Sequence, residues 1–191
     1  MNTLFSHVCV VTMDERMSVW TDAFVGVTDG KISYLSKHAP EEKPDQIIDA
    51  TGMVLMPGLI NCHTHLPMQL LRGYADDLKL QEWLNDYIFP REDRLDGRCV
   101  RAATTLAVAE CLKFGVTSVS DMYYFCDDIC DVIAKSGMKA NISRGTSMFL
   151  GDDFDFEKFP ACQELVALKN KWHNYDNGRI KIEASIHAEY T

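Results

Sequence analysis

The sequence predicts an α/β protein in which a small β unit precedes a parallel sheet covered by helices. Residues 1 to 55 show strand patterns and little helix. From residue 56 onward, strand and helix patterns alternate along the chain. Such alternation is typical of parallel sheets with crossover helices, either doubly wound or closed into a barrel. At the start of the second part, an extended apolar run ends in His63 and His65.

The first part of the chain reads as short strands. Residues 4–12 and 23–35 have strand patterns, and Asp29-Gly30 interrupts the second with a typical two-residue hairpin turn. We then expect a single buried strand that leads to the histidines, with a turn at Pro57-Gly58; its aliphatic and β-branched residues are Ile47, Ile48, Val54, Leu55, Leu59 and Ile60. This β unit has few apolar residues and no helix, so we expect it to pack against a segment elsewhere.

The second part of the chain predicts helices that alternate with strands. A helix is expected over residues 96–115, with Asp96 as its N-cap and Gly115 as its stop. Its apolar face would consist of Val100, Ala103, Ala107, Cys111 and Phe114. The elements expected after it are strands at 116–122, 139–143 and 180–186, a helix at 127–136 that Gly137 ends, and a helix at 160–173.

Polar side chains follow the predicted strands, where the chemistry of such folds is found. His63 and His65 follow the first strand, Asp121 the second, Arg144 the third and His187 the fourth. In an extended segment His63 and His65 point the same way, so their imidazoles can share a metal ion. Structural roles compete with these: the two histidines as a polar strand end, Asp121 as a loop brace, Arg144 as a surface cation, and His187 as a structural histidine.

Composition restricts the class of partner. A net charge of -9 and a pI near 5.1 argue against nucleic acid and anionic membrane surfaces, which favours a small-molecule partner. No apolar run is long enough to span a membrane, and the N-terminus lacks signal-peptide features, so we expect a cytoplasmic protein. The 7 cysteines include no C-x-x-C motif, which argues against a disulfide framework or a cysteine zinc site. We expect most of them to be buried.

Several separated motifs, in this order, resemble the amidohydrolase superfamily, and within it the 5-methylthioadenosine/S-adenosylhomocysteine deaminases. The motifs are Pro57–Met68, Leu71–Gly73, Asp76–Leu78, Glu82–Leu84, Phe89–Glu92, Ser120–Tyr123, Ser143–Gly145 and His187–Thr191. The resemblance covers the whole chain. It has one departure, because the family usually has proline where this chain has Glu189.

The resemblance implies a fold and a site. It implies the first half of a metal-dependent (β/α)8 TIM-like barrel at residues 56–191, preceded by part of a small β-sandwich domain at residues 1–55. A divalent metal, usually Zn²⁺ with Fe²⁺ as an alternative, would be bound by His63 and His65. Glu92 would hold the ribose hydroxyls of the substrate, and Arg144 and His187 would contact it.

The implied reaction is hydrolytic deamination of 5-methylthioadenosine or S-adenosylhomocysteine to the inosyl product and ammonia. Two alternatives remain: an amidohydrolase for guanine or triazine-type rings, and a non-catalytic fragment. A complete barrel takes about 250 residues, so residues 56–191 have room for four βα units. We therefore expect the catalytic groups to lie beyond Thr191, and the chain to be inactive alone. We also expect it to self-associate or to pair with a missing C-terminal half.

Overall fold

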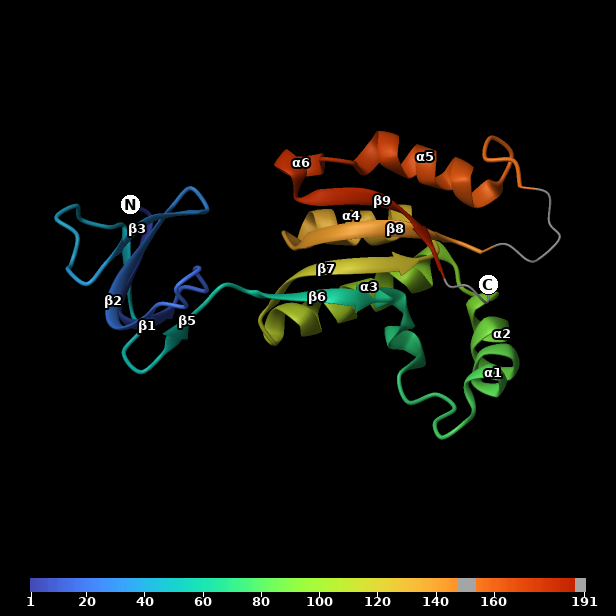
Figure 1. Cartoon of the computed structure of the whole chain (residues 1–191), viewed down its shortest axis with the longest axis horizontal. Helices are drawn as coiled ribbons and strands as arrows, with labels where there is room; N and C mark the ends of the chain where they lie inside the picture. Colours follow the sequence, from blue (N-terminus) through green and yellow to red (C-terminus); the bar gives the residue numbers. More distant parts are fainter. Residues whose placement is uncertain (148–153, 188–191) are drawn as a thin grey trace. The chain divides into compact units, whose positions relative to one another are not determined.

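A computed structural model of the chain describes residues 1–147 and 154–187 (Figure 1). The chain divides into two units, Met1–Pro57 and Gly58–Thr191. The first unit contains strands only, whereas the second alternates strands with helices. None of the helices that the structure describes is both long and apolar enough to cross a membrane.

The first unit is a 5-stranded sheet with strand order β3-β2-β1-β4, in which β5 also pairs with β1. Its strands are β1 (Thr3–Val11), β2 (Val19–Thr28), β3 (Lys31–Ser36), β4 (Gln46–Asp49) and β5 (Val54–Leu55). One side of the sheet buries small apolar residues: Val8, Val10, Ala23, Val25 and Ala50. The partly buried rings of Phe5 and Trp20 pack against this cluster.

The predicted hairpin is confirmed, and the single strand predicted after it is wrong. Asp29 and Gly30 both have positive φ, 49° and 74°, which is the backbone of a type I′ hairpin turn between β2 and β3. The run predicted as one buried strand forms three strands, β4, β5 and β6 (Leu59–Thr64). The first two pair with β1, and β6 begins the second sheet. Ile47 and Ile60 are 62% and 68% exposed, because their strands lie at sheet edges.

The second unit repeats a strand-then-helix pattern. Its further elements are η1 (Leu66–Leu71), α1 (Leu80–Glu82), the π-helix η2 (Trp83–Ile88), α2 (Phe89–Glu92), α3 (Gly97–Lys113), β7 (Val116–Tyr123), α4 (Cys126–Ser136), β8 (Lys139–Thr146), α5 (Pro160–Trp172), the irregular turn α6 (Tyr175–Gly178) and β9 (Ile180–Ile186). The short helices before α3 were not predicted. The π-helix is a rare form that sequence pattern does not signal.

The strand order distinguishes a barrel from a doubly wound sheet. The strands β6, β7, β8 and β9 pair in chain order and are all parallel. A doubly wound sheet reverses its strand order at a switch point, whereas a (β/α)8 barrel keeps chain order throughout. Figure 1 shows α3 and α4 behind the strands, and α5 packs on β8 and β9. The core lies between sheet and helices, with the side chains of Ile129, Ile133 and Ile142 fully buried.

Both ends of α3 confirm the sequence signals. The Asp96 carboxylate accepts the Cys99 N–H at 2.7 Å, and Gly115 follows the helix with φ 79°. Gly137 ends α4 with the same φ. Phe114 does not join the predicted apolar face, because it is the C-cap residue beyond the last turn and is 67% exposed.

The cysteines are less buried than predicted. Cys126, Cys130 and Cys162 are buried, whereas Cys62 is exposed and the other three are half-buried. The exposure of Cys62 follows from its place in β6, at the edge of the second sheet.

Candidate metal and substrate site

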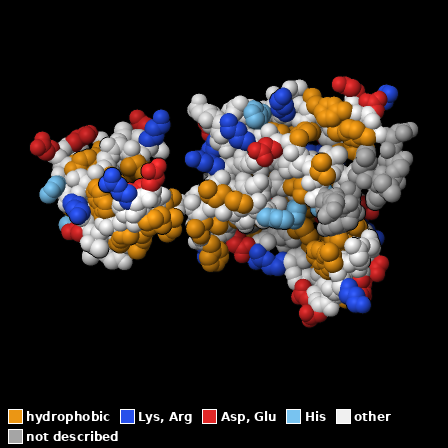
Figure 2. All heavy atoms as spheres, in the orientation of Figure 1, with side chains coloured by type: hydrophobic (Ala, Val, Ile, Leu, Met, Phe, Trp, Pro, Cys, Tyr) orange, Lys and Arg blue, Asp and Glu red, His pale blue; other side chains and the backbone are white. Residues whose placement is uncertain are grey.

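The two histidines lie side by side at the end of β6. His63 lies in the strand and is exposed. His65 is the first residue after the strand and is half-buried. Their ring centroids are 5.2 Å apart with the planes at 85°. Figure 2 shows histidine side chains open to the surface on the visible face of the second unit, with hydrophobic side chains beside them. The extended segment therefore places both imidazoles together, as the spacing predicts.

One contact indicates the tautomer of the neutral His65 ring. Its Nδ1 lies 2.6 Å from the Met122 carbonyl oxygen of β7. A carbonyl oxygen can only accept a hydrogen bond, so Nδ1 carries the hydrogen. In the neutral ring the lone pair is then on Nε2, the atom left to bind a metal.

Asp121 is buried in β7, beneath the segment that carries His65. It is 1% exposed, and its Oδ1 accepts the Thr64 hydroxyl at 2.8 Å and the Leu66 N–H at 2.6 Å. Burial raises the pKa of this carboxyl to about 6, against the lowering effect of the two hydrogen bonds and of His65. The expectation that Asp121 follows its strand is wrong, because β7 continues to Tyr123. Its contacts match the competing role of a loop brace.

The donor chemistry of the histidine pair fits the implied divalent metal. Neutral imidazole nitrogens bind Zn²⁺ and Fe²⁺, and the Nδ1–H of His65 is directed to a carbonyl as in known metal-ligating histidines. Within residues 1–147 and 154–187, no group of three or more His, Cys, Asp or Glu side chains is arranged to hold an ion. The histidines therefore supply two donors, fewer than the three or four protein ligands of a typical zinc site.

Glu92 lies at the end of α2 and is held by β7. The Tyr123 hydroxyl donates to Glu92 Oε1 at 2.6 Å, and the Tyr123 ring lies 6.2 Å from that of His65. Burial, together with the hydrogen bond to Glu92, raises the pKa of the Tyr123 phenol, so it stays protonated and remains the donor. A carboxylate held by one oxygen keeps acceptor capacity for neighbouring hydroxyl groups.

His187 brings the end of the fourth strand to the same place. It directly follows β9, as predicted, and its ring centroid is 6.4 Å from that of His65. Its backbone N–H donates to the Thr146 carbonyl at 3.2 Å, which ties it to β8. The ends of β6 and β9 thus both contribute an imidazole to one region.

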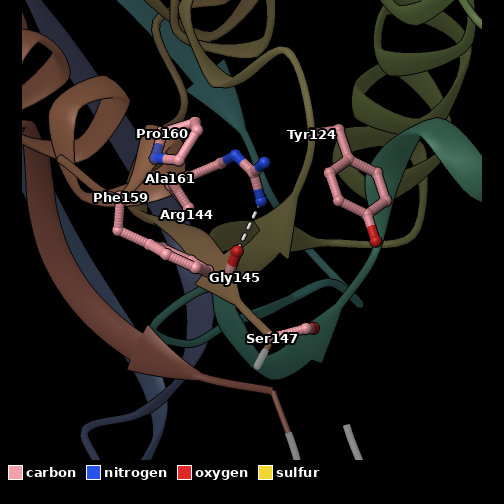
Figure 3. A pocket seen from close by; sticks show the side chains of 7 residues that line it. All are labelled: Tyr124, Arg144, Gly145, Ser147, Phe159, Pro160 and Ala161. Atoms are coloured by element: carbon pink, nitrogen blue, oxygen red, sulfur yellow. Dashed lines mark hydrogen bonds between the residues drawn. The ribbon is translucent and has the colours of Figure 1, made fainter. Parts of the chain in front are cut away.

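Arg144 lies in β8 rather than after it, and it lines a separate hollow (Figure 3). Its Nε donates to Glu164 of α5 at 2.5 Å, and its guanidinium lies 4.8 Å from the Tyr124 ring centroid. The hollow has a volume of about 210 Å³. It is lined by Tyr124, Arg144, Gly145, Ser147, Phe159, Pro160 and Ala161. One cation among mostly apolar walls suits a small ligand with both an apolar and a polar part.

A second hollow, of about 280 Å³, has the two histidines on one wall. On its other side Glu110 of α3 accepts hydrogen bonds from both Gln69 and Arg72. The guanidinium of Arg72 and the Gln69 amide lower the pKa of the Glu110 carboxyl. The charges of Arg72 and Glu110 therefore balance each other, and the other metal-ligand types in the lining are the two histidines and Cys111.

Sequence reasoning missed the residues that hold the candidate groups. Tyr124 and Glu164 were not singled out, and Thr64 and Tyr123 appeared only within motifs. These residues contact partners far along the chain, and a sequence without strand register gives no signal for such pairs. Glu189, the departure from the family pattern, lies outside the described residues.

The chain is similar in sequence to known proteins. A family model described as "Amidohydrolase family" matches residues 54–191. A 5-methylthioadenosine/S-adenosylhomocysteine deaminase from Thermoanaerobacter pseudethanolicus is 35% identical over 191 residues, which is 100% of this chain and 44% of the relative. A 5'-deoxyadenosine deaminase from Methanosphaera stadtmanae is 39% identical over 172 residues, covering 88% of this chain and 39% of the relative.

A solved structure shows the same fold. The crystal structure of an adenosine deaminase from Xanthomonas campestris with bound zinc has a TM-score of 0.86 and 31% identity, and the match covers 100% of this chain and 44% of that one. The fold is thus the predicted one, the first half of a (β/α)8 barrel preceded by part of a small β-sandwich. The chain spans less than half the length of each of these proteins.

Proposed function

Because the chain belongs to the amidohydrolase family, we propose that it is part of a metal-dependent deaminase for adenosine-type nucleosides. The substrates proposed are 5-methylthioadenosine and S-adenosylhomocysteine, which appear in the name of the relative from T. pseudethanolicus. The products would be the inosyl compound and ammonia. The observation that carries the proposal is the His63–His65 pair, with rings 5.2 Å apart and the Nδ1–H of His65 directed to a backbone carbonyl.

The proposed site assigns a role to each group. The imidazoles of His63 and His65 would hold a divalent metal, Zn²⁺ in the first instance and Fe²⁺ as the alternative. When bound, such a metal supplies a Lewis acid that activates water for attack on the carbon bearing the amino group. Glu92, held by Tyr123, would accept the ribose hydroxyls. The imidazole of His187, near His65, would contact the purine ring.

Arg144 would bind the part of the substrate farthest from the base. Its hollow combines one guanidinium with the apolar Phe159, Pro160 and Ala161, which suits the 5' substituent of such nucleosides. Three of these groups, Glu92, Arg144 and His187, come from different βα units. We propose that residues 56–191 form the first four units of the barrel and that residues 1–55 are part of a β-sandwich domain.

The described residues also support an incomplete site and open edges. With two metal donors described, we propose that the chain alone does not deaminate. Strands β6 and β9 are the edges of the second sheet, and Ile60 and Ile186 there are 68% and 82% exposed. Open edges and exposed apolar groups favour association. We therefore expect self-association or pairing with further barrel units, measured by light scattering. A monodisperse monomer at high concentration would contradict this.

The test measures metal, nucleoside binding and turnover in parallel. Purified chain is expected to bind zinc and to bind 5-methylthioadenosine in calorimetric titrations, without ammonia release. The native protein isolated from its source is expected to release ammonia from 5-methylthioadenosine faster than from guanine or a triazine. A native protein that prefers guanine or a triazine would contradict the proposed nucleoside substrates. A native protein isolated without metal would contradict the proposed metal dependence.

A further inference from the structure

We propose that Asp121 is a positioning residue that holds His65 in its metal-binding orientation. This inference rests on the proposed function, because it concerns how the proposed ligand is held. Asp121 is on β7, whereas the histidines are on the neighbouring strand and the loop after it. Its carboxylate contacts the residue before His65 and the residue after it.

The contacts around His65 form a consecutive set. The Ser120 carbonyl accepts the Thr64 hydroxyl at 3.0 Å, and Asp121 Oδ1 accepts that same hydroxyl and the Leu66 N–H. The Met122 carbonyl accepts from Nδ1 of His65. Ser120, Asp121 and Met122 of β7 therefore hold the three consecutive residues 64–66, where β6 ends and η1 begins. Asp121 is the member of the set whose side chain alone holds both flanks of His65.

The Leu66 N–H explains why an acceptor is needed at this point. Leu66 begins the helix η1, whose first N–H groups have no partner within the helix. His65 is the N-cap residue and its side chain makes no capping bond. Because Leu66 is buried, its N–H is shielded from water, and Asp121 supplies the missing acceptor. Without Asp121, the peptide between His65 and Leu66 would lose the hydrogen bond that holds the backbone from which the His65 ring projects.

The burial of Asp121 shows how strongly this arrangement is held. A carboxyl group that is 1% exposed has lost nearly all its water, and two hydrogen bonds to Oδ1 offset part of that cost. In the low dielectric of the interior such hydrogen bonds are electrostatically stronger than in water. They fix the segment before any metal arrives.

The test compares three variants. Asp121→Ala removes Oδ1, the acceptor of both hydrogen bonds, and Asp121→Asn keeps an amide oxygen that can accept both bonds. Thr104→Val is the matched control, because Thr104 is also a fully buried polar residue of this unit and its hydroxyl lacks a partner. Folding is checked by circular dichroism. The His65 tautomer is measured from the ring-nitrogen chemical shifts of isotope-labelled protein without metal, and the Zn²⁺ dissociation constant by calorimetry.

We expect His65 to be the Nδ1–H tautomer in the wild type, in Asp121→Asn and in Thr104→Val. In Asp121→Ala the ring should populate both tautomers, and Zn²⁺ binding should weaken by about 10- to 100-fold. If Asp121→Ala fails to fold, Thr64→Val removes one of the two bonds and should show the same changes to a smaller extent.

Two outcomes would overturn the proposal. One is an Asp121→Ala protein that folds and keeps both the wild-type tautomer and the wild-type affinity for Zn²⁺. The other is an Asp121→Asn protein that behaves as Asp121→Ala does. Should the wild type bind no zinc, the proposed function fails, yet the tautomer measurement still decides whether Asp121 positions His65.

Discussion

His65 and Arg144 are both candidate site residues of the second unit, but they are held in different ways. His65 is flanked by hydrogen bonds to the buried Asp121 and is itself bonded to a backbone carbonyl of β7. Arg144 is held by Glu164, whose side chain is 57% exposed, and by the face of the Tyr124 ring. The proposed metal ligand is therefore held from the interior of the protein, and the proposed substrate contact is held from the surface.

This difference separates a fixed part of the site from an exchangeable part. Buried hydrogen bonds hold a ligand in place before binding, which is what a metal site with defined geometry requires. The Arg144–Glu164 pair has one exposed partner, because Glu164 is 57% and Arg144 16% exposed, and water screening of such a pair limits its contribution to stability. We propose that Arg144 exchanges Glu164 for a substrate group, whereas His65 keeps the contacts that β7 makes with it and its neighbours.

The largest effect is expected from the histidines. His63→Ala or His65→Ala should abolish metal retention, because the loss of one of two described donors removes most of the affinity. Elemental analysis after dialysis measures the metal content. His38→Ala is the control, since His38 is exposed in the first unit and should leave the metal content unchanged. Stoichiometric metal in the double His63/His65 variant would show that these residues are not ligands.

A smaller loss is expected when the carboxylate of Glu92 is removed. Glu92→Ala should weaken nucleoside binding by about 1.5 to 3 kcal/mol, the usual contribution of hydrogen bonds to a charged group. Zinc content should not change. Calorimetric titration with 5'-deoxyadenosine measures the effect, and free adenine, which lacks the ribose, is the matched ligand control. An equal loss for both ligands would assign Glu92 to the base and not to the ribose.

Tyr123→Phe should have the next smaller effect. It removes only the hydroxyl that holds Glu92, so nucleoside binding should weaken by about 1 kcal/mol. The Glu92→Ala/Tyr123→Phe double variant should bind as weakly as Glu92→Ala alone, because the hydroxyl acts through the carboxylate. Additive losses would mean that Tyr123 has a separate contact with the ligand.

The smallest effect on stability is expected at the surface pair. Glu164→Gln should change the free energy of unfolding by less than about 1 kcal/mol, because exposed ion pairs contribute little. Urea unfolding measures this. The variant frees Arg144, so affinity for S-adenosylhomocysteine, which carries a carboxylate, should rise relative to that for 5-methylthioadenosine, which carries none. A large loss of stability would show that the Arg144–Glu164 pair is a structural contact, like the contacts that hold His65.

Much of the fold followed from local signals. Asp96 and Gly115 predict the ends of α3 because capping and positive φ are properties of single positions. The histidine spacing likewise places two rings on one side of an extended segment. The division of residues 47 to 60 into three strands was missed, since apolar content does not tell which strand each segment pairs with.

The sequence predicted the candidate site residues, but among the residues that hold them it singled out only Asp121. Asp121 and Thr64 are 57 residues apart in sequence, and only the register between β6 and β7 brings them together. Glu164 has no motif around it, and its pairing with Arg144 depends on how α5 packs on β8. Side chains that hold others are thus the part of a site that a single sequence reveals least.

The strand order of the second sheet also bears on how the chain folds during synthesis. Each strand from β7 to β9 pairs with the strand that precedes it in the chain. Each new strand therefore finds its neighbour already made, although the loops to be closed are long: Leu59 pairs with Val116 and Ala140 with Ile180. In the first unit, β2 pairs with one edge of β1, and the other edge stays unpaired until β4 and β5 have been made. The second sheet can thus grow by one strand at a time, whereas the first closes only after residue 55 has been made.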